Sequence, residues 1–326
     1  MTELKRIGVL TSGGDAPGMN AAIRAVVRGS IYHGVEPVAI REGYKGLIDN
    51  DLEVVNARSV ANIINQGGTF LKSARCQEFR TKEGRAKAYE NARAANLDGL
   101  VVIGGDGSFT GAMLLEEEHG IPCIGVPGTI DNDIYGTDYT IGYDTALNTV
   151  VEAIDKIRDT ATSHNRLFFI EVMGRDAGFI ALNTGIAAGA EEILIPEQEN
   201  SVEKLMSGLQ SSGRAGKTSS IIVVAEGDKS GGVFELARTV EKSFPEYEAK
   251  VTVLGHIQRG GKPSCFDRVL ASRLGVAAVE ALLKGESGIM VGVRDQQVVK
   301  TPLERAISKQ NTIDSHLMKV AEIITV

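Results

Sequence analysis

The chain has 326 residues, of which 43% are apolar and 24% charged, and its formal net charge is −7 at pH 7. This length favours about two domains, and the apolar content is enough to bury a core. The net negative charge gives no general attraction for nucleic acids or membranes, so we expect neither as a partner. Three separated cysteines, no signal-peptide layout and no apolar run of membrane-spanning length predict a cytoplasmic protein.

Strand-like and helix-like segments alternate along the whole chain. Strands are predicted at residues 6–10, 35–40, 100–103, 123–126, 167–172, 193–195, 220–225 and 251–254, and a strand pair at 289–293 and 297–299. Helices are predicted at 19–27, 60–64, 82–95, 109–118, 145–160, 179–188, 202–209, 233–244 and 267–283. An exposed loop is expected at 69–80 and a polar linker at 211–219. The alternation predicts an α/β fold with two doubly wound, mainly parallel sheets, whose ligands lie beyond the carboxyl ends of the strands.

Two glycine turns follow the first and third predicted strands. Gly13 and Gly14 let the backbone approach a phosphate, although a tight turn with nothing bound fits them equally well. The second turn reads GGDGS over residues 104–108, where three glycines leave room for a nucleotide. Asp106 could hold magnesium through water, or it could cap the following helix, for which Ser108 is another cap candidate.

The stretch PGTIDNDIYGTDYTIGYD at residues 127–144 gathers four aspartates after an apolar run. Carboxylates at the end of a buried strand are costly to desolvate unless a cation lies among them, which points to magnesium and a phosphate-bearing substrate. In an extended segment Asp131 and Asp133 would point the same way, one as a base and the other ordering the metal. The alternative is a turn cluster that only closes the loop. The two acidic turns together predict phosphoryl transfer.

The segment SSGRAGKT at 211–218 ends like a phosphate-binding P-loop. It begins with Ser211 instead of glycine, and it precedes a predicted strand where a P-loop follows one. We therefore interpret it as a linker.

These motifs together resemble the bacterial ATP-dependent 6-phosphofructokinases, nearly from end to end. The matching segments are GVLTSGGDAPGMNAAIR (8–24), GGTFLKSARC (67–76), VVIGGDGS (101–108), PGTIDNDI (127–134), EVMGR (171–175), VVAEG (223–227), VLGHIQRGG (253–261) and FDRVLASRLG (266–275). The resemblance implies transfer of the ATP γ-phosphoryl group to the 1-hydroxyl of fructose 6-phosphate, with Mg²⁺. It also implies an ATP-binding domain (1–142 plus 260–305), a fructose 6-phosphate-binding domain (143–259 plus 306–326), and an active site between them.

The resemblance assigns roles to individual residues. ATP would contact Gly14, Arg75, Cys76, Gly105, Asp106, Gly107 and Ser108, with Asp106 also serving the metal. Asp131 would be the base, Thr129 and Asp133 would assist, and Arg175 would offset charge on the transferred group. The sugar phosphate would contact Thr129, Ile130, Asp131, Met173, Gly174, Arg175, Glu226, His256 and Arg259, joined by Arg166 and Lys250 from a neighbouring subunit of a homotetramer.

Two departures from the family pattern concern affinity and regulation. Lys250 stands where relatives usually have an arginine, so the two-pronged grip on phosphate is lost and weaker sugar-phosphate binding is expected. An effector site for ADP or phosphoenolpyruvate would use Arg24, Arg28, Arg58, Arg158, Gly189, Glu191 and Lys217. Ala215, Thr218 and Ser219 replace residues that are often basic there, which predicts weak regulation.

Three alternatives stay open at this point. A pyrophosphate-dependent enzyme is disfavoured because such relatives carry a larger residue at Gly107 and a lysine at Gly128, and both positions are open here. A kinase of the GGDG type that acts on NAD or lipid would lack the TIDND and MGR segments together. A non-catalytic nucleotide sensor would predict loss of Asp131 or Asp106, and both are present.

Overall fold

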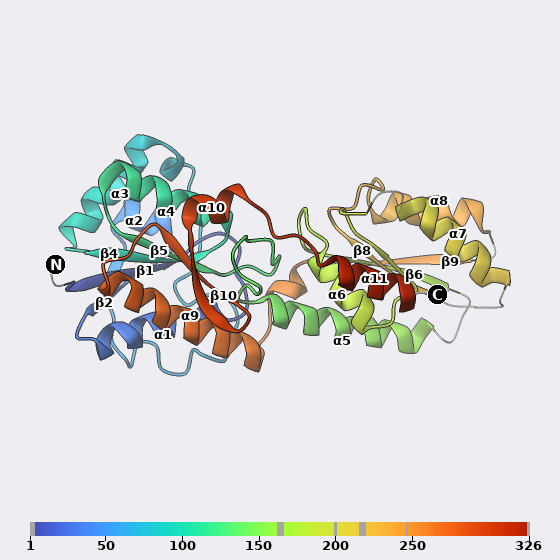
Figure 1. The fold of residues 1–326 in the computed structure, drawn as a ribbon, viewed down its shortest axis with the longest axis horizontal. Helices are drawn as coiled ribbons and strands as arrows, with labels where there is room; N and C mark the ends of the chain where they lie inside the picture. The colour runs from blue at the N-terminus through green and yellow to red at the C-terminus, as the bar shows by residue number, and fades with distance from the viewer. Residues whose placement is uncertain (1–3, 162–165, 199–200, 215–219, 246, 325–326) are drawn as a thin grey trace. The chain divides into compact units, whose positions relative to one another are not determined.

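The structure is a computed structural model that describes residues 4–161, 166–198, 201–214, 220–245 and 247–324. Its backbone contacts divide the chain into two compact units, both drawn in Figure 1. Unit 1 contains Met1–Thr145 and Arg259–Asn311, and unit 2 contains Ala146–Gln258 and Thr312–Val326. Every helix in the described part of the chain is too short or too polar to cross a lipid bilayer.

Unit 1 is built on a seven-stranded sheet in the order β11-β10-β5-β4-β1-β2-β3. Its strands are β1 (Arg6–Thr11), β2 (Glu36–Ile40), β3 (Leu52–Val54), β4 (Gly99–Gly104), β5 (Cys123–Pro127), β10 (Ile289–Arg294) and β11 (Gln297–Pro302). The five strands from β10 to β2 run parallel, and an antiparallel strand closes each edge. Strands β4 and β5 are buried along their whole length, as their near-continuous apolar runs require in a sheet covered on both faces.

Helices cover both faces of this sheet (Figure 1). Helices α1 (Met19–Tyr32) and α9 (Cys265–Leu283) pack together on one face. The other face carries α2 (Tyr44–Asp49), η1 (Glu78–Arg80), α3 (Lys82–Ala94), α4 (Asp106–His119) and α10 (Leu303–Ser308). A buried apolar cluster that includes Leu100, Val102 and Phe109 fills the space between this second layer and the sheet.

Unit 2 has a four-stranded parallel sheet in the order β7-β8-β6-β9. Its strands are β6 (Arg166–Val172), β7 (Glu192–Leu194), β8 (Ser220–Ala225) and β9 (Glu248–Val253). Its helices are α6 (Phe179–Ala187), α7 (Ser201–Arg214), α8 (Val233–Ser243) and α11 (Ser315–Ile324), with most of α5 (Tyr143–Ala161) and of η2 (Gly255–Arg259). The mainly parallel sheet of unit 1 and the parallel sheet of unit 2 confirm the predicted α/β class.

Some predicted elements were wrong or missed. Residues 60–64 form turns instead of a helix, because Asn62 has a left-handed backbone (φ 60°) while Val60 and Ile63 are buried as anchors. The supposed linker at 211–219 is helical as far as Arg214, and 215–219 lie outside the described residues. The short elements β3, α2 and α10 and the C-terminal α11 were not predicted.

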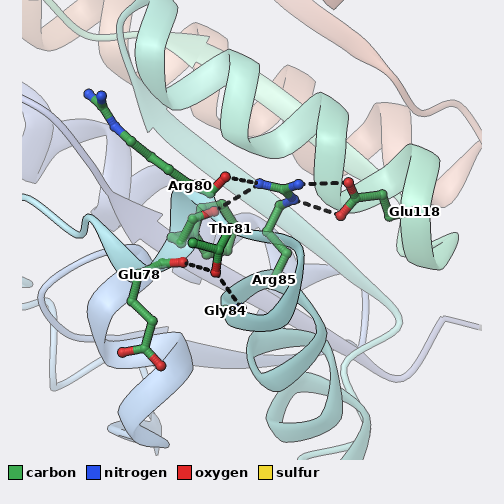
Figure 2. Close-up of polar contacts among 7 residues, drawn as sticks. Glu78, Arg80, Thr81, Gly84, Arg85 and Glu118 are labelled. Carbon is green, nitrogen blue, oxygen red and sulfur yellow. Dashed lines mark hydrogen bonds and ion pairs between the residues drawn. The ribbon is translucent and has the colours of Figure 1, made fainter.

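An ion pair between the buried Arg85 and the half-buried Glu118 fixes the end of the loop that precedes α3 (Figure 2). Arg85 of α3 donates to both carboxylate oxygens of Glu118 of α4, at 2.6 and 2.7 Å. Its third nitrogen donates to the carbonyl oxygens of Phe79 and Arg80, at 3.1 and 2.8 Å. Thr81 then begins α3 by accepting a backbone N–H of the first turn. The paired guanidinium therefore connects the loop to two helices.

Candidate active site

Three strand ends lie side by side in unit 1, because β1, β4 and β5 are neighbours in the sheet. The backbone N–H of Ser12 donates to the carbonyl of Ile103 at 3.0 Å. The N–H of Gly128 donates to the carbonyl of Gly104 at 2.9 Å. The turn after each strand is thus joined to its neighbour, and the predicted glycine and acidic turns meet at one edge of the sheet.

The first turn brings together two residues to which different roles were assigned. A Cβ atom added at Gly14 would lie 2.5 Å from a terminal nitrogen of Arg259, so only glycine lets the guanidinium approach so closely. The same nitrogen donates to the carbonyl of Asp15 at 3.3 Å. Arg259, a candidate for the sugar phosphate, therefore lies in unit 1 beside Gly14, a candidate for ATP.

The second turn leads directly into α4. Gly105 is the N-cap residue with no side-chain cap, so the interpretation of Asp106 or Ser108 as a cap was wrong. Asp106 is the first helical residue and is partly exposed, whereas Ser108 is buried. The first turn of an uncapped helix directs its N–H groups and its positive dipole end outward, which suits a phosphate. Gly107 is exposed, and a Cβ atom added there would meet nothing within 4 Å.

The loop after β5 buries one carboxylate without a partner. Asp131 is 3% exposed, and its Oδ1 atom makes no hydrogen bond with any residue that the structure describes. Its backbone N–H donates to the hydroxyl of Thr129 at 3.3 Å. The loop is closed by Asn132, whose Oδ1 accepts from the N–H of Thr140 at 2.8 Å and whose Nδ2 donates to the carbonyl of Asp138 at 3.1 Å. Loop closure therefore depends on the amide, which leaves the Asp131 carboxylate for chemistry.

The backbone between the two aspartates corrects one expectation. Asn132 has φ 57°, so the segment is not extended, and the argument that Asp131 and Asp133 point the same way loses its basis. A Cβ atom added at Gly105 would lie 3.9 Å from the Cβ of Thr129, which places the two acidic turns side by side. Ile130 between Thr129 and Asp131 is fully buried and anchors the loop.

A buried carboxylate that sequence reasoning missed holds the far end of this loop. Asp267 of α9 is fully buried and accepts hydrogen bonds from the N–H of Gly142 at 2.9 Å and of Thr145 at 2.8 Å. The hydroxyl of Thr145 also donates to it, at 2.5 Å. Burial raises the pKa of Asp267 to about 6 despite these donors. The partners of Asp267 lie more than 100 positions earlier in the chain, so no local pattern of residues signalled its role.

The loop at 67–76 lies against the first turn. Ser73 donates from its hydroxyl to the carbonyl of Gly13 at 2.8 Å, and Thr11 donates to the carbonyl of Lys72 at 2.9 Å. Cys76 is half-buried and packs against the core, whereas the Arg75 side chain is exposed. The loop therefore packs on the glycine turn and carries an exposed cation two residues beyond this contact.

In unit 2, Glu226 gathers the turn that follows β6. Its Oε1 atom accepts the N–H of Gly174 at 3.2 Å and of Arg175 at 2.7 Å. Arg175 has a left-handed backbone with φ 54°, and its side chain is exposed. Gln258, which was not predicted, is fully buried and accepts the N–H of Met173. Four of the predicted sugar-binding residues thus form one cluster at the carboxyl ends of β6 and β8.

Two other candidates lie at the opposite end of β6. Arg166 opens that strand and donates from Nε to Glu248 of β9 at 2.7 Å. Lys250 lies 2.5 Å from the other carboxylate oxygen of Glu248. Unit 2 therefore does not bring these cations to the Glu226 cluster. His256 is exposed in η2.

The effector candidates are divided between the two units. Arg24 and Arg28 lie on α1, where burial and then the nearby Arg28 charge lower the pKa of Arg24, and Arg58 lies in the turns after β3. In unit 2, Arg158 donates to the carbonyl of Gly189 at 2.8 Å. It also lies 3.8 Å from the carboxylate of Glu191. Lys217 lies outside the described residues.

The donors at the acidic turns fit a magnesium ion. Among the described residues, no three acidic, histidine or cysteine side chains lie close enough to hold a metal by themselves. Magnesium suits such a place, because it keeps several waters and binds through one or two carboxylates plus substrate phosphates. The Asp131 oxygen without a partner and the Asp106 carboxylate at the uncapped helix end supply that kind of donor.

Comparison with known proteins gives matches over nearly the whole chain. Residues 6–282 match the family model described as Phosphofructokinase. A Thermus thermophilus protein named ATP-dependent 6-phosphofructokinase 1 is 58% identical over 321 residues, covering 98% of this chain and 99% of its own. The phosphofructokinase structure from Saccharomyces cerevisiae aligns with TM-score 0.86 and 37% identity over 98% of this chain, which spans half of that yeast chain. A pyrophosphate-dependent phosphofructokinase from Marinobacter aquaeolei aligns with TM-score 0.83 and 26% identity, covering 96% of this chain and 86% of its own.

Proposed function

Because this chain belongs to the phosphofructokinase family, we propose that it transfers the γ-phosphoryl group of ATP to the 1-hydroxyl of fructose 6-phosphate. The products are fructose 1,6-bisphosphate and ADP. One observation carries the proposal: the buried Asp131 carboxylate has an oxygen without a partner and lies on the turn beside the uncapped start of α4.

Unit 1 is assigned to ATP. The N–H groups at the start of α4 face the phosphates, Asp106 supports the metal, and Arg75 and Gly14 come from the neighbouring loop and turn. The open space at Gly107 favours ATP over pyrophosphate, because a larger donor needs that room. Cys76 and Ser108 support this side of the site from partly and fully buried positions.

The chemistry needs alignment and charge compensation more than covalent help. A bound Mg²⁺ would neutralise charge on the phosphates, held by Asp106 and supported by Asp133. Asp131 accepts the proton of the sugar hydroxyl, and it does so late in the transfer because an alcohol has a high pKa. Thr129 orients this loop by accepting the N–H of Asp131.

Unit 2 is assigned to fructose 6-phosphate. Glu226 orders Met173, Gly174 and Arg175 for the sugar, and Arg175 offsets charge on the transferred group. The 6-phosphate is assigned to His256 of unit 2 and to Arg259 of unit 1, with Arg166 and Lys250 supplied by a neighbouring subunit of a homotetramer. Each of these cations can donate hydrogen bonds to a phosphate. In this proposal, subunit association brings Arg166 and Lys250 to the site.

Weak activation by ADP, or inhibition by phosphoenolpyruvate, is assigned to the arginines of α1, to Arg58 and to the Arg158–Glu191 pair. Activity curves at subsaturating fructose 6-phosphate, with and without ADP, measure the strength of the activation directly. We further assign the protein to the cytoplasm.

A coupled assay tests the donor and the acceptor together. The purified protein is supplied with fructose 6-phosphate, Mg²⁺ and either ATP or pyrophosphate, and fructose 1,6-bisphosphate is measured. The proposal predicts product with ATP and none above background with pyrophosphate. Turnover with pyrophosphate alone would make it a pyrophosphate-dependent enzyme, and no turnover with either donor would favour a nucleotide sensor.

A further inference from the structure

One carboxylate in unit 2 holds two cations at once. Arg166 donates to Oε2 of Glu248 at 2.7 Å, and the Lys250 ammonium lies 2.5 Å from Oε1. Arg166 and Glu248 face each other in the pairing of β6 with β9, and Lys250 follows two residues later on the same side of β9. The strand geometry therefore brings all three side chains to one face of the sheet edge.

The ion pairs leave the phosphate-binding groups unused. Arg166 is held through Nε alone, so its two terminal nitrogens make no hydrogen bond within the described part of the chain. The Lys250 ammonium uses one of its three N–H donors for Glu248, which leaves two for another acceptor. With Nε bound to Glu248, the two terminal nitrogens of the guanidinium can together donate two parallel hydrogen bonds to a phosphate.

The charge balance also favours this arrangement. Arg166 and Lys250 would repel each other if they stood alone, and the carboxylate between them offsets that repulsion. Hydrogen bonds from Lys250 and Arg166 lower the pKa of Glu248 to about 2. Glu248 is thus ionised over the working pH range, and the three groups keep a net charge of one positive unit.

We propose that Glu248 is a positioning residue that fixes Arg166 and Lys250 as a two-cation clamp for the phosphate of a sugar phosphate. The inference rests on the proposed function, since it assumes that these cations bind the substrate. It adds a residue that acts through both cations without contacting the sugar. It also lessens the loss of affinity expected from lysine at position 250, because the carboxylate restricts a side chain that would otherwise be free to rotate.

The variant Glu248→Gln tests the clamp in steady-state kinetics with ATP and fructose 6-phosphate. Glutamine has one acceptor oxygen and no charge, so it cannot hold both cations. Exposed ion pairs of this kind predict a rise of about two- to fivefold in the half-saturating concentration of fructose 6-phosphate, with kcat unchanged. Glu248→Ala, which removes the whole side chain, is expected to give at least the same rise.

A matched control separates the clamp from a general charge effect. Glu53 of β3 pairs at 2.6 Å with Arg41, the residue that follows β2, and its exposure resembles that of Glu248. Glu53→Gln is expected to leave the half-saturating concentration unchanged. The midpoint of thermal unfolding is expected to stay within about 2 °C of wild type in both variants.

A double-mutant cycle shows whether Glu248 acts through the two cations. In an Arg166→Gln/Lys250→Met background, Glu248→Gln should cause no further rise, because nothing is left to position. An unchanged half-saturating concentration in Glu248→Gln alone would overturn the proposal. A lowered value would also overturn it, because it would show that Glu248 competes with the substrate phosphate for the two cations. If Arg166→Gln/Lys250→Met itself leaves the value unchanged, these cations do not serve the substrate, and the assignment to the sugar-phosphate site fails together with the clamp.

Discussion

The pH dependence of stability tests whether the buried carboxylate of Asp267 anchors the end of the loop that carries Asp131. The carboxylate is fully buried, and it accepts three hydrogen bonds from Gly142 and Thr145 at the end of the loop. Burial raises its pKa from 3.8 to about 6, against the effect of these donors. The native state therefore binds a proton more tightly than the unfolded state does.

The sign and size follow from linkage. A raised acid pKa contributes stability that is fully present below the unfolded value near 3.8 and is lost as pH rises through about 6. Each pKa unit corresponds to about 1.36 kcal/mol, so the whole contribution is about 3 kcal/mol, of which roughly 1.3 kcal/mol appears between pH 7 and pH 5.

The assay compares urea unfolding of wild type and Asp267→Asn at pH 7, 6 and 5, and the series for the control variant below extends to pH 4 and 3. The free energy of unfolding of wild type minus that of the variant should increase by about 1.3 kcal/mol as pH falls from 7 to 5. A control of opposite sign is Glu118→Gln: Arg85 lowers the pKa of Glu118, so the corresponding difference should decrease as pH falls below about 4.5. A flat or falling Asp267 difference between pH 7 and pH 5 would refute the reasoning.

Three further predictions concern ATP binding at Gly107, the affinity for fructose 6-phosphate, and the ion pair of Arg85 that holds the loop before α3. Gly107→Asp should raise the KM for ATP at least about tenfold with unchanged thermal stability, because the new side chain enters open space; an unchanged KM would contradict the assignment. Lys250→Arg should lower the half-saturating concentration of fructose 6-phosphate by about two- to fivefold, since it restores a two-pronged donor, and an unchanged value in the same assay would refute this. Arg85→Met should destabilise the protein by about 2 kcal/mol in urea unfolding, mainly because it leaves two loop carbonyls without their donor. A loss below about 1 kcal/mol would show that these contacts are not structural.

The sequence predicted the parts of the site that local chemistry determines. The alternation of apolar strands with glycine turns located the start of α4 and the loop at Asp131, because strand, turn and helix each leave a short-range pattern. The resemblance, carried by eight separate motifs, identified the family that the comparisons confirm. Periodicity also placed most strands within one or two residues of their observed bounds.

The parts that failed depend on contacts distant in sequence or on one backbone angle. Asp267 reaches Gly142 across 125 positions, and Gln258 reaches Met173 across 85, so no local pattern announced either. The extended geometry expected around Asp131 was lost because Asn132 adopts a left-handed backbone and closes the loop with its own amide. The helix expected at 60–64 failed because burial of Val60 and Ile63 in a turn overrode local propensity.

The role of Asp131 is the centre of the account, and its replacement by asparagine is the most direct test. Asparagine keeps the size of the side chain and removes the proton acceptor, so kcat with ATP and fructose 6-phosphate should fall by about 10²–10⁴-fold. Calorimetric binding of both substrates should stay within a few-fold of wild type, because the loop is closed by Asn132. A kcat within tenfold of wild type for Asp131→Asn would show that this carboxylate does not receive the proton of the sugar hydroxyl.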